Sequence, residues 1–157
     1  MNMGGVEDAF AHAYLTCDKT YLENAKARND AAALFAGTCA VGVFVDCATN
    51  TVCCSNLGDS RCVVGLFEDG DLKTVDMSSD HQAQDPREAA RIKAEHPNDP
   101  TALVHMSEDD DDWRVKGICA FTRSIGDTQM KDKAAATIYN SCVLLDIVVT
   151  MALTDAG

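Results

Sequence analysis

The residues best suited to chemistry in this sequence lie in short polar turns between apolar segments. The first of these turns is Gly58–Asp59–Ser60–Arg61. A carboxylate that follows a glycine at the end of a strand can reach into a cleft and bind a hard cation. The alternative is an ordinary β-turn in which Asp59 bonds its own backbone, and spacing alone favours that alternative.

The second turn, Ser79–Asp80–His81, holds two parts of a nucleophilic site, in which Asp80 would orient His81. Neighbouring side chains on an extended segment point in opposite directions, however. We therefore do not expect a catalytic dyad at these residues.

A third polar cluster runs from Arg114 to Gly117 and from Phe121 to Asp127. The planar guanidinium of Arg114 suits phosphate, which it can bind through two parallel hydrogen bonds. Arg123 and Asp127 flank a glycine turn and could pair with each other. Structural ion pairs explain these charges at least as well as a ligand site does.

Two helices are expected to position these turns. Apolar residues recur at steps of three or four between residues 5 and 28 and predict a helix with one buried face: Val6, Phe10, Ala13, Cys17 and Tyr21. Asp18 on this helix is expected to be a solvated carboxylate. A second helix should begin after Asp85, with Pro86 in its first turn and Glu88 completing a capping box, and end near Glu95.

Strands are predicted over residues 39–45, 51–55, 62–67, 72–75 and 115–121, with a tight hairpin turn at Asp69–Gly70. Residues 97–112 read as a polar, solvated loop, and residues 142–153 as a buried strand. Short consecutive strands with tight turns indicate antiparallel pairing. The expected fold class is therefore α+β, with helices packed on antiparallel sheet.

The composition of the chain disfavours some classes of binding partner. The 157 residues suit one domain, and 13 Lys and Arg against 25 Asp and Glu give a net charge of −12, which disfavours nucleic acid. The most apolar stretch is too short to span a bilayer, so we expect no membrane partner. The eight cysteines show no C-x-x-C spacing. They are expected to be reduced, buried thiols of an intracellular protein, cytoplasmic or mitochondrial, without a zinc site.

Taken in order between Gly37 and Lys131, the polar clusters resemble the motifs of the metal-dependent (PPM, or protein phosphatase 2C-like) serine/threonine phosphatases. Gly37–Thr38–Cys39–Ala40 is similar to that family's G-[ST]-T-A opening, Asn56 to Arg61 to N-x-G-D-S-R, and Ser79–Asp80–His81 to S-x-D-H with one residue fewer. Arg114 to Gly117 resembles R-V-x-G, and Phe121 to Asp127 resembles [AL]-x-[ST]-R-[AS]-[FIL]-G-D. The residues that carry this likeness are Gly37, Thr38, Gly58, Ser60, Arg61, Asp80, His81, Arg114, Gly117, Arg123, Gly126 and Asp127.

The resemblance implies a fold of two stacked antiparallel β-sheets flanked by helices, here a partial β-sandwich. It also implies a protein substrate carrying phosphoserine or phosphothreonine. In the family, two Mg²⁺ or Mn²⁺ ions activate a water for in-line attack on phosphorus. Residues 80–85 and the following helix, which leads into Glu95–His96–Pro97, are most similar to the pyruvate dehydrogenase phosphatase branch.

The resemblance also shows which parts of the family pattern are missing. The family's R-x-x-x-E-D, D-G-H-G-G and final D-N elements, which supply most metal ligands, do not occur in this sequence. The family patterns leave two expected metal ligands: Asp59, and Asp155 in a segment similar to [ST]-D-G. We therefore expect residues 1–157 to be one incomplete phosphatase domain with little or no activity. The alternative is a pseudophosphatase that binds partners without catalysis.

Overall fold

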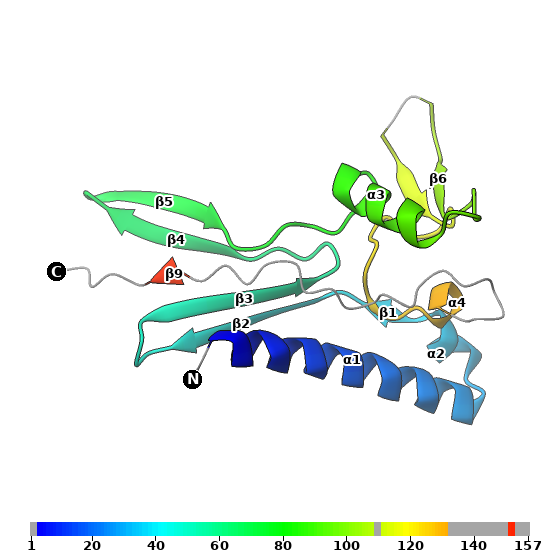
Figure 1. The fold of residues 1–157 in the computed structure, drawn as a ribbon, viewed down its shortest axis with the longest axis horizontal. Coiled ribbons are helices and arrows are strands. Elements are labelled where there is room, and N and C mark those ends of the chain that lie inside the picture. The colour runs from blue at the N-terminus through cyan, green and yellow to red at the C-terminus, as the bar shows by residue number, and fades with distance from the viewer. Residues whose placement is uncertain (1–2, 109–110, 132–150, 153–157) are drawn as a thin grey trace.

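The computed structural model describes residues 3–108, 111–131 and 151–152, and Figure 1 shows their arrangement. The elements in chain order are α1 (Met3–Arg28), α2 (Ala31–Phe35), β1 (Gly37–Thr38), β2 (Ala40–Asp46), β3 (Thr51–Leu57), β4 (Val63–Glu68), β5 (Asp71–Asp76), α3 (Pro86–Glu95), β6 (Leu103–His105), β7 (Trp113–Val115), β8 (Ile125–Gly126), α4 (Thr128–Lys131) and β9 (Met151–Ala152). The strands pair antiparallel as β1–β8, β2–β3–β9, β4–β5 and β6–β7. The predicted α+β class with antiparallel sheets is confirmed.

The long helix α1 follows from a run of good helix formers, mainly alanine and leucine, and ends where the chain turns left-handed. Asn29 has a φ of 50°. The amide of Asp30 donates to the carbonyl of Ala25 at 3.2 Å, and the amide of Asn29 donates to the carbonyl of Lys26 at 3.1 Å. This pair of hydrogen bonds is the Schellman arrangement, which satisfies carbonyls that a helix end otherwise leaves open.

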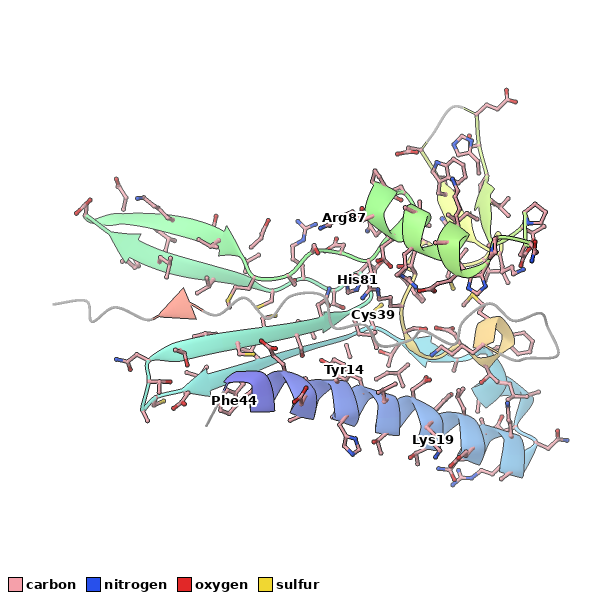
Figure 2. All side chains as sticks on the ribbon, in the orientation of Figure 1. Tyr14, Lys19, Cys39, Phe44, His81 and Arg87 are labelled. Atoms are coloured by element: carbon pink, nitrogen blue, oxygen red, sulfur yellow. The ribbon has the colours of Figure 1, made fainter. Side chains whose placement is uncertain are left out.

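The buried stripe of α1 differs from the predicted one. Val6 is buried and Phe10 half-buried as expected, but Ala13 and Cys17 are exposed. The stripe instead passes through Tyr14, whose hydroxyl lies 2.9 Å from the hydroxyl of Ser55 on β3. In Figure 2, Tyr14 lies on the strand-facing side of the helix. Tyr21 is half-buried as predicted, and Ala25 extends the stripe, so steps of three and four still describe the buried face.

Strand β3 lies between helix α1 and the β4–β5 hairpin (Figure 1). Its side chains alternate between these two neighbours, as strand geometry requires. Ser55 contacts Tyr14 of α1, whereas Val52 and Cys54 pack with Met77 on the other side. This position explains why β3 is buried along almost its whole length.

The hairpins agree with their turn residues. Asp69 and Gly70 link β4 to β5 with φ values of 54° and 88°, which is the left-handed pair that a two-residue hairpin needs. In the β2–β3 turn, the side chain of Asp46 accepts a hydrogen bond from the amide of Ala48 at 2.9 Å. The predicted turn at Asp69–Gly70 is confirmed.

A second small core lies around α3, β6 and β7. It consists of Ala83, Ile92, Ala102, Leu103, Val115 and Met130. Helix α3 has the predicted bounds, and Asp85 caps it by accepting from the amide of Arg87 at 2.8 Å. The predicted capping box is wrong. The amide of Asp85 donates to the carbonyl of Gln82 at 3.0 Å, and the side chain of Glu88 is buried elsewhere.

Two other predictions for this part of the chain are also wrong. The expected loop 97–112 contains strand β6, since residues 103–105 pair with Trp113–Val115. The expected strand 115–121 ends at Val115, because Lys116 and Gly117 take φ values of 53° and 70° and turn the chain back. The predicted strand 142–153 falls almost wholly outside the described residues, apart from β9.

None of the helices in the described ranges combines the length and apolar character that crossing a lipid bilayer requires.

Candidate functional site: the motif junction

Four turns that are far apart in the sequence meet at the centre of the molecule. We call this group the motif junction; its members are Gly37–Cys39, Gly58–Asp59, His81 and Thr122–Asp127. His81 holds two of the turns together. Its ring Nδ1 accepts from the amide of Gly58 at 3.0 Å, its own amide donates to the carbonyl of Gly58 at 2.9 Å, and its carbonyl accepts from the amide of Thr122 at 2.9 Å.

Asp80 and His81 point apart, as predicted. His81 is buried against Gly58, whereas Asp80 forms an ion pair with Arg61 through two hydrogen bonds of 3.0 and 2.9 Å. In this arrangement His81 has a structural role, because its ring organises the turn that presents Asp59.

The other end of the junction is the contact between β1 and β8. Gly37 pairs with Gly126, and Thr38 pairs with Ile125. The carboxylate of Asp127 lies directly against Gly37, where a Cβ atom would come within 2.0 Å of Oδ2. Asp127 is 5% exposed. The suggested Asp127–Arg123 pair is wrong, because Asp127 faces Gly37 while Arg123 reaches Glu88.

Asp59 and Cys39 interact inside the junction. The thiol of Cys39 donates to the carboxylate Oδ1 of Asp59 at 3.2 Å. Burial, together with the negative charges of Asp59 and Asp127, raises the pKa of Cys39 to about 11. Burial and Asp127 raise the pKa of Cys119 to about 11 in the same way. These thiols are therefore neutral near pH 7, and the Cys39 thiol acts as a hydrogen-bond donor.

Glu88 of α3 holds one side of the Thr122–Asp127 segment. Its carboxylate accepts from Nε of Arg123 at 3.0 Å, from the hydroxyl of Thr122, and from Nη2 of Arg91 at 2.8 Å. The side chains of Arg123 and Glu88 are only 2% and 4% exposed. Burial alone would raise the pKa of Glu88, but the hydrogen bonds from Arg123, Arg91 and Thr122 outweigh it and hold that pKa well below its ordinary value.

Asp18 of α1 anchors the same segment from the opposite side. Its carboxylate accepts from the amide of Gly126 at 2.8 Å and from Nζ of Lys131 at 2.7 Å, and Lys131 also donates to the carbonyl of Ser124 at 2.6 Å. The prediction that Asp18 is solvated is wrong, since it is 8% exposed. The signal in the sequence was its position four residues after Tyr14, in the stripe that faces the strands.

Replacing Asp18 with asparagine should lower the free energy of unfolding by about 2 kcal/mol, since a charge-assisted bond is lost while Lys131 stays buried. The amide can still accept from Gly126, so the fold should persist. Urea denaturation followed by circular dichroism measures the loss. The matched control is Asp8→Asn, an exposed carboxylate on the same helix, which should change stability by less than about 0.5 kcal/mol. Equal losses in the two variants would contradict the anchoring role.

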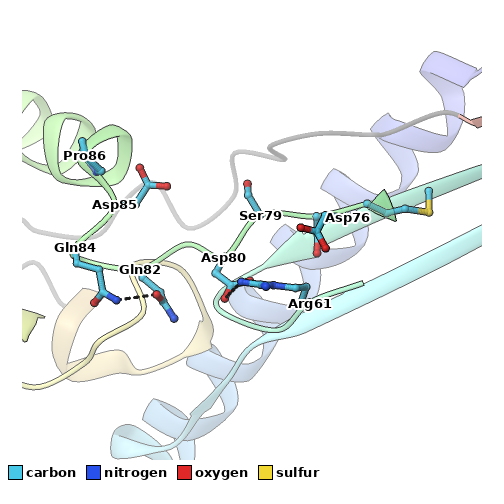
Figure 3. A pocket seen from close by; sticks show the side chains of 10 residues that line it. Arg61, Asp76, Ser79, Asp80, Gln82, Gln84, Asp85 and Pro86 are labelled. Carbon is cyan, nitrogen blue, oxygen red and sulfur yellow. Dashed lines mark hydrogen bonds and ion pairs between the residues drawn. The ribbon is translucent and has the colours of Figure 1, made fainter. Parts of the chain in front are cut away.

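An open depression of about 560 Å³ lies beside Arg61 and Asp80 and is shown in Figure 3. Its wall carries the carboxylates of Asp76, Asp80 and Asp85 and the guanidinium of Arg61. The only cation among these lining residues is already paired with Asp80. The depression therefore offers no free positive charge to a phosphate group.

Arg114 and Gly117 lie outside the junction. Arg114 belongs to strand β7, and Gly117 lies in the turn that follows it. Arg114 pairs with Asp112, with 2.7 Å between Nε and Oδ1, and donates to the carbonyl of Ile118 at 3.5 Å. Of the two interpretations of Arg114, the structural ion pair is therefore confirmed. Ser60 lies half-buried in the turn between Asp59 and Arg61.

The metal centre that the family resemblance implies can be tested against these contacts. Within residues 3–108, 111–131 and 151–152, no three His, Cys, Asp or Glu side chains come together in a way that could hold a cation. Asp59 accepts a hydrogen bond from the thiol of Cys39, and Asp155 lies outside the described residues. The described residues therefore do not by themselves fit a two-cation centre.

The sequence comparisons match this chain to proteins described as protein phosphatase 2C. A family model described as protein phosphatase 2C matches residues 2–150. The chain is 34% identical over 128 residues to "Probable protein phosphatase 2C 67" of Arabidopsis thaliana, covering 80% of this chain and 33% of that protein. It is 40% identical over 95 residues to "Probable protein phosphatase 2C 72" of Oryza sativa subsp. japonica, covering 59% of this chain and 23% of that protein.

Among solved structures, a C. elegans sex determining protein superposes with a TM-score of 0.65 at 18% identity, covering 95% of this chain and 31% of that chain. At this identity the likeness concerns the fold alone. The chain thus spans about a third or less of the length of the proteins it matches.

Proposed function

The chain belongs to the protein phosphatase 2C family, and we propose that it supplies the central scaffold of a metal-dependent protein serine/threonine phosphatase domain. The observation that supports this proposal is the motif junction. Residues that resemble the family's motifs lie in separate turns, yet they form one connected group. Gly58 contacts His81 and lies close to the carbonyl of Arg123, and Gly37 lies against Asp127. A set of turns selected only for local structure would have no reason to converge.

The junction has a mechanical role in this proposal. The short chain from β3 to β4 must present Asp59 in a fixed position, and the two bonds between Gly58 and His81 hold its base. Glu88 and Asp18 fix the facing segment from two sides. A catalytic centre depends on such supporting contacts, because small displacements of reacting groups cost large factors in rate.

The family is generally dependent on Mg²⁺ or Mn²⁺, and that requirement limits what this chain is expected to do alone. Cations of this kind activate water and neutralise charge on a phosphoryl group. Asp59 and Asp155 are the proposed ligands, and two carboxylates are too few for a tight pair of ions. We therefore expect residues 1–157 to show little or no phosphatase activity in isolation.

A pseudophosphatase that binds partners without catalysis is the second candidate. The lack of a metal-ligand cluster among the described residues favours it. In both cases the proposed partner is a protein that carries phosphoserine or phosphothreonine. Free thiols at every cysteine that the structure describes support an intracellular location, cytoplasmic or mitochondrial.

Within the family we propose the pyruvate dehydrogenase phosphatase branch. The support is residues 80–85 with the helix that follows. In the structure Ala83 of this segment is buried, and its amide donates to the carbonyl of Ala120 at 2.7 Å. Ala83 lies between His81 of the junction and Asp85, which caps α3. The segment therefore connects the junction to the helix that carries Glu88.

A phosphatase assay with a phosphothreonine peptide and Mn²⁺ tests the proposal. The isolated chain should release no phosphate above the buffer rate. Turnover that disappears both with a chelator and in Asp59→Ala would overturn the prediction of inactivity.

A chimera separates the scaffold from the pseudophosphatase. Residues of this chain replace the matching segment of the Arabidopsis relative named above, whose own remaining segments complete the domain. The scaffold hypothesis predicts an active chimera whose rate falls by at least about tenfold in Asp59→Ala. Asp69→Ala, in the exposed hairpin turn, is the control and should leave the rate unchanged. A folded chimera without activity would favour the pseudophosphatase.

A further inference from the structure

Two neighbouring cysteines of β3 point into different layers. Cys53 faces α1, where the negative charge of Glu7 and, above all, burial raise its pKa. Cys54 faces the other way and packs with Val52 and Met77. Both are buried, at 1% and 0% exposed. Among the described residues, the cluster around Cys54 also includes the thiol of a cysteine from another segment.

That second thiol belongs to Cys62, which lies half-buried just before β4. Cys62 packs against the cluster that contains Cys54, and its thiol is one of the groups that raise the pKa of the Cys54 thiol. The backbone fixes Cys62 there. Its carbonyl accepts from the amide of Met77 at 2.9 Å, and its amide donates to the hydroxyl of Ser78 at 2.8 Å.

We propose that Cys54 and Cys62 are an oxidation site at which hydrogen peroxide forms a disulfide. Both side chains pack in one small cluster, and the bonds to Met77 and Ser78 hold Cys62 there; this packing supplies the proximity that the reaction needs. The proposal rests on these contacts and is independent of the proposed phosphatase function.

The order of events follows from exposure. Cys54 has no exposed surface, so peroxide meets the sulfur of Cys62 first. That sulfur takes one peroxide oxygen to become a sulfenic acid, and the other oxygen leaves as water. The sulfur of Cys54 then bonds to the sulfur of Cys62, the S–O bond breaks, and the proton of the Cys54 thiol goes to the departing oxygen as a second water. The two thiols lose two electrons in total, which peroxide accepts.

The neutral state of Cys54 fits this order. Burial, together with the neighbouring thiols of Cys62 and Cys53, raises its pKa to about 12. Cys54 is thus a poor first target for peroxide, but it carries the proton that the second step needs.

The bond would enclose residues 55–61, which include Gly58 and Asp59 of the motif junction. It would also join the β2–β3 sheet covalently to the β4–β5 hairpin. Oxidation is therefore expected to restrict the turn that presents Asp59, and a thiol reductant should reverse it.

Peptide mapping of the full chain tests the proposal. The reduced protein is treated with hydrogen peroxide, remaining thiols are blocked, and trypsin cuts after Arg61, between the two cysteines. The expected product is the peptide Cys62–Lys73 linked to the peptide 29–61, and dithiothreitol should separate the two. Cys54→Ser and Cys62→Ser should abolish this product. Cys53→Ser, equally buried but facing α1, is the matched control and should retain it.

Two outcomes would overturn the proposal. One is a linked product that survives in Cys54→Ser. The other is a Cys62 peptide that accumulates as sulfinic acid without a link in the unmodified sequence. If a serine variant fails to fold, fragmentation of the linked wild-type peptide still decides the matter, because it assigns the bond to Cys54 or to Cys53.

Discussion

Replacing Glu88 with alanine should lower the free energy of unfolding by about 3–5 kcal/mol, because it leaves buried cations without their counter-charge. Arg123 is 2% exposed and Arg91 is 14% exposed at the side chain, and both donate to this carboxylate. Urea denaturation followed through the fluorescence of Trp113 measures the change. Glu95→Ala is the matched control. Glu95 pairs with Arg91 on the same helix but is 32% exposed, so its loss should cost less than about 1 kcal/mol.

The pH dependence of stability gives the same prediction a second readout. The pKa of folded Glu88 lies below its ordinary value of 4.5, so the ionised carboxylate contributes stability above about pH 4.5. That contribution is lost as the pH falls toward the folded pKa. The wild-type protein should therefore lose stability between about pH 5 and lower pH more steeply than Glu88→Gln. Parallel pH profiles for the two proteins would contradict the assignment of Glu88 as the centre of the buried ion pairs.

Replacing Gly126 with alanine should cost about 3–5 kcal/mol, from backbone strain and overpacking together. Gly126 has a φ of +85°, which side chains other than glycine rarely adopt. An added Cβ would also lie 2.4 Å from the carbonyl oxygen of Ala36 and 2.9 Å from Cα of Gly37, both of which are backbone atoms. The β1–β8 contact would have to open. Urea denaturation followed by circular dichroism measures the loss.

Gly70→Ala separates the two causes of that loss. Gly70 has nearly the same φ, +88°, but nothing lies within 4 Å of an added Cβ. It should therefore cost only about 1 kcal/mol, the contribution of the conformation alone. If both glycine variants lose the same stability, the close approach of β1 and β8 does not contribute.

Local structure was largely predictable from the sequence, because local chemistry decides it. The hairpin at Asp69–Gly70 and the start of α3 at Pro86 follow from backbone preferences that act over a few residues. The strand predicted beyond Val115 failed where two consecutive left-handed residues, Lys116 and Gly117, break the run. The apolar composition of residues 115–121 did not predict that turn.

The partners of the buried charges were not predictable in the same way. Glu88 has the right spacing for a capping box, and nothing near it shows that Arg123 lies beneath the helix. Asp18 looks like any polar helix residue until the segment around Gly126 is placed beside it. A single sequence contains the charges but not the long-range pairing, so the motif resemblance located the junction while only the folded chain revealed its two anchors.

The bond between Asp18 and Gly126 spans 108 positions of the chain. Loop-closure entropy must be overcome before such a contact becomes favourable, so this contact should form late and slow the folding reaction. During synthesis at about 5–20 residues per second, α1 would wait roughly 5–20 s for its partner to leave the ribosome. Through that interval the carboxylate of Asp18 stays without its partner Gly126. A nascent chain of this kind is expected to depend on chaperones more than its size suggests.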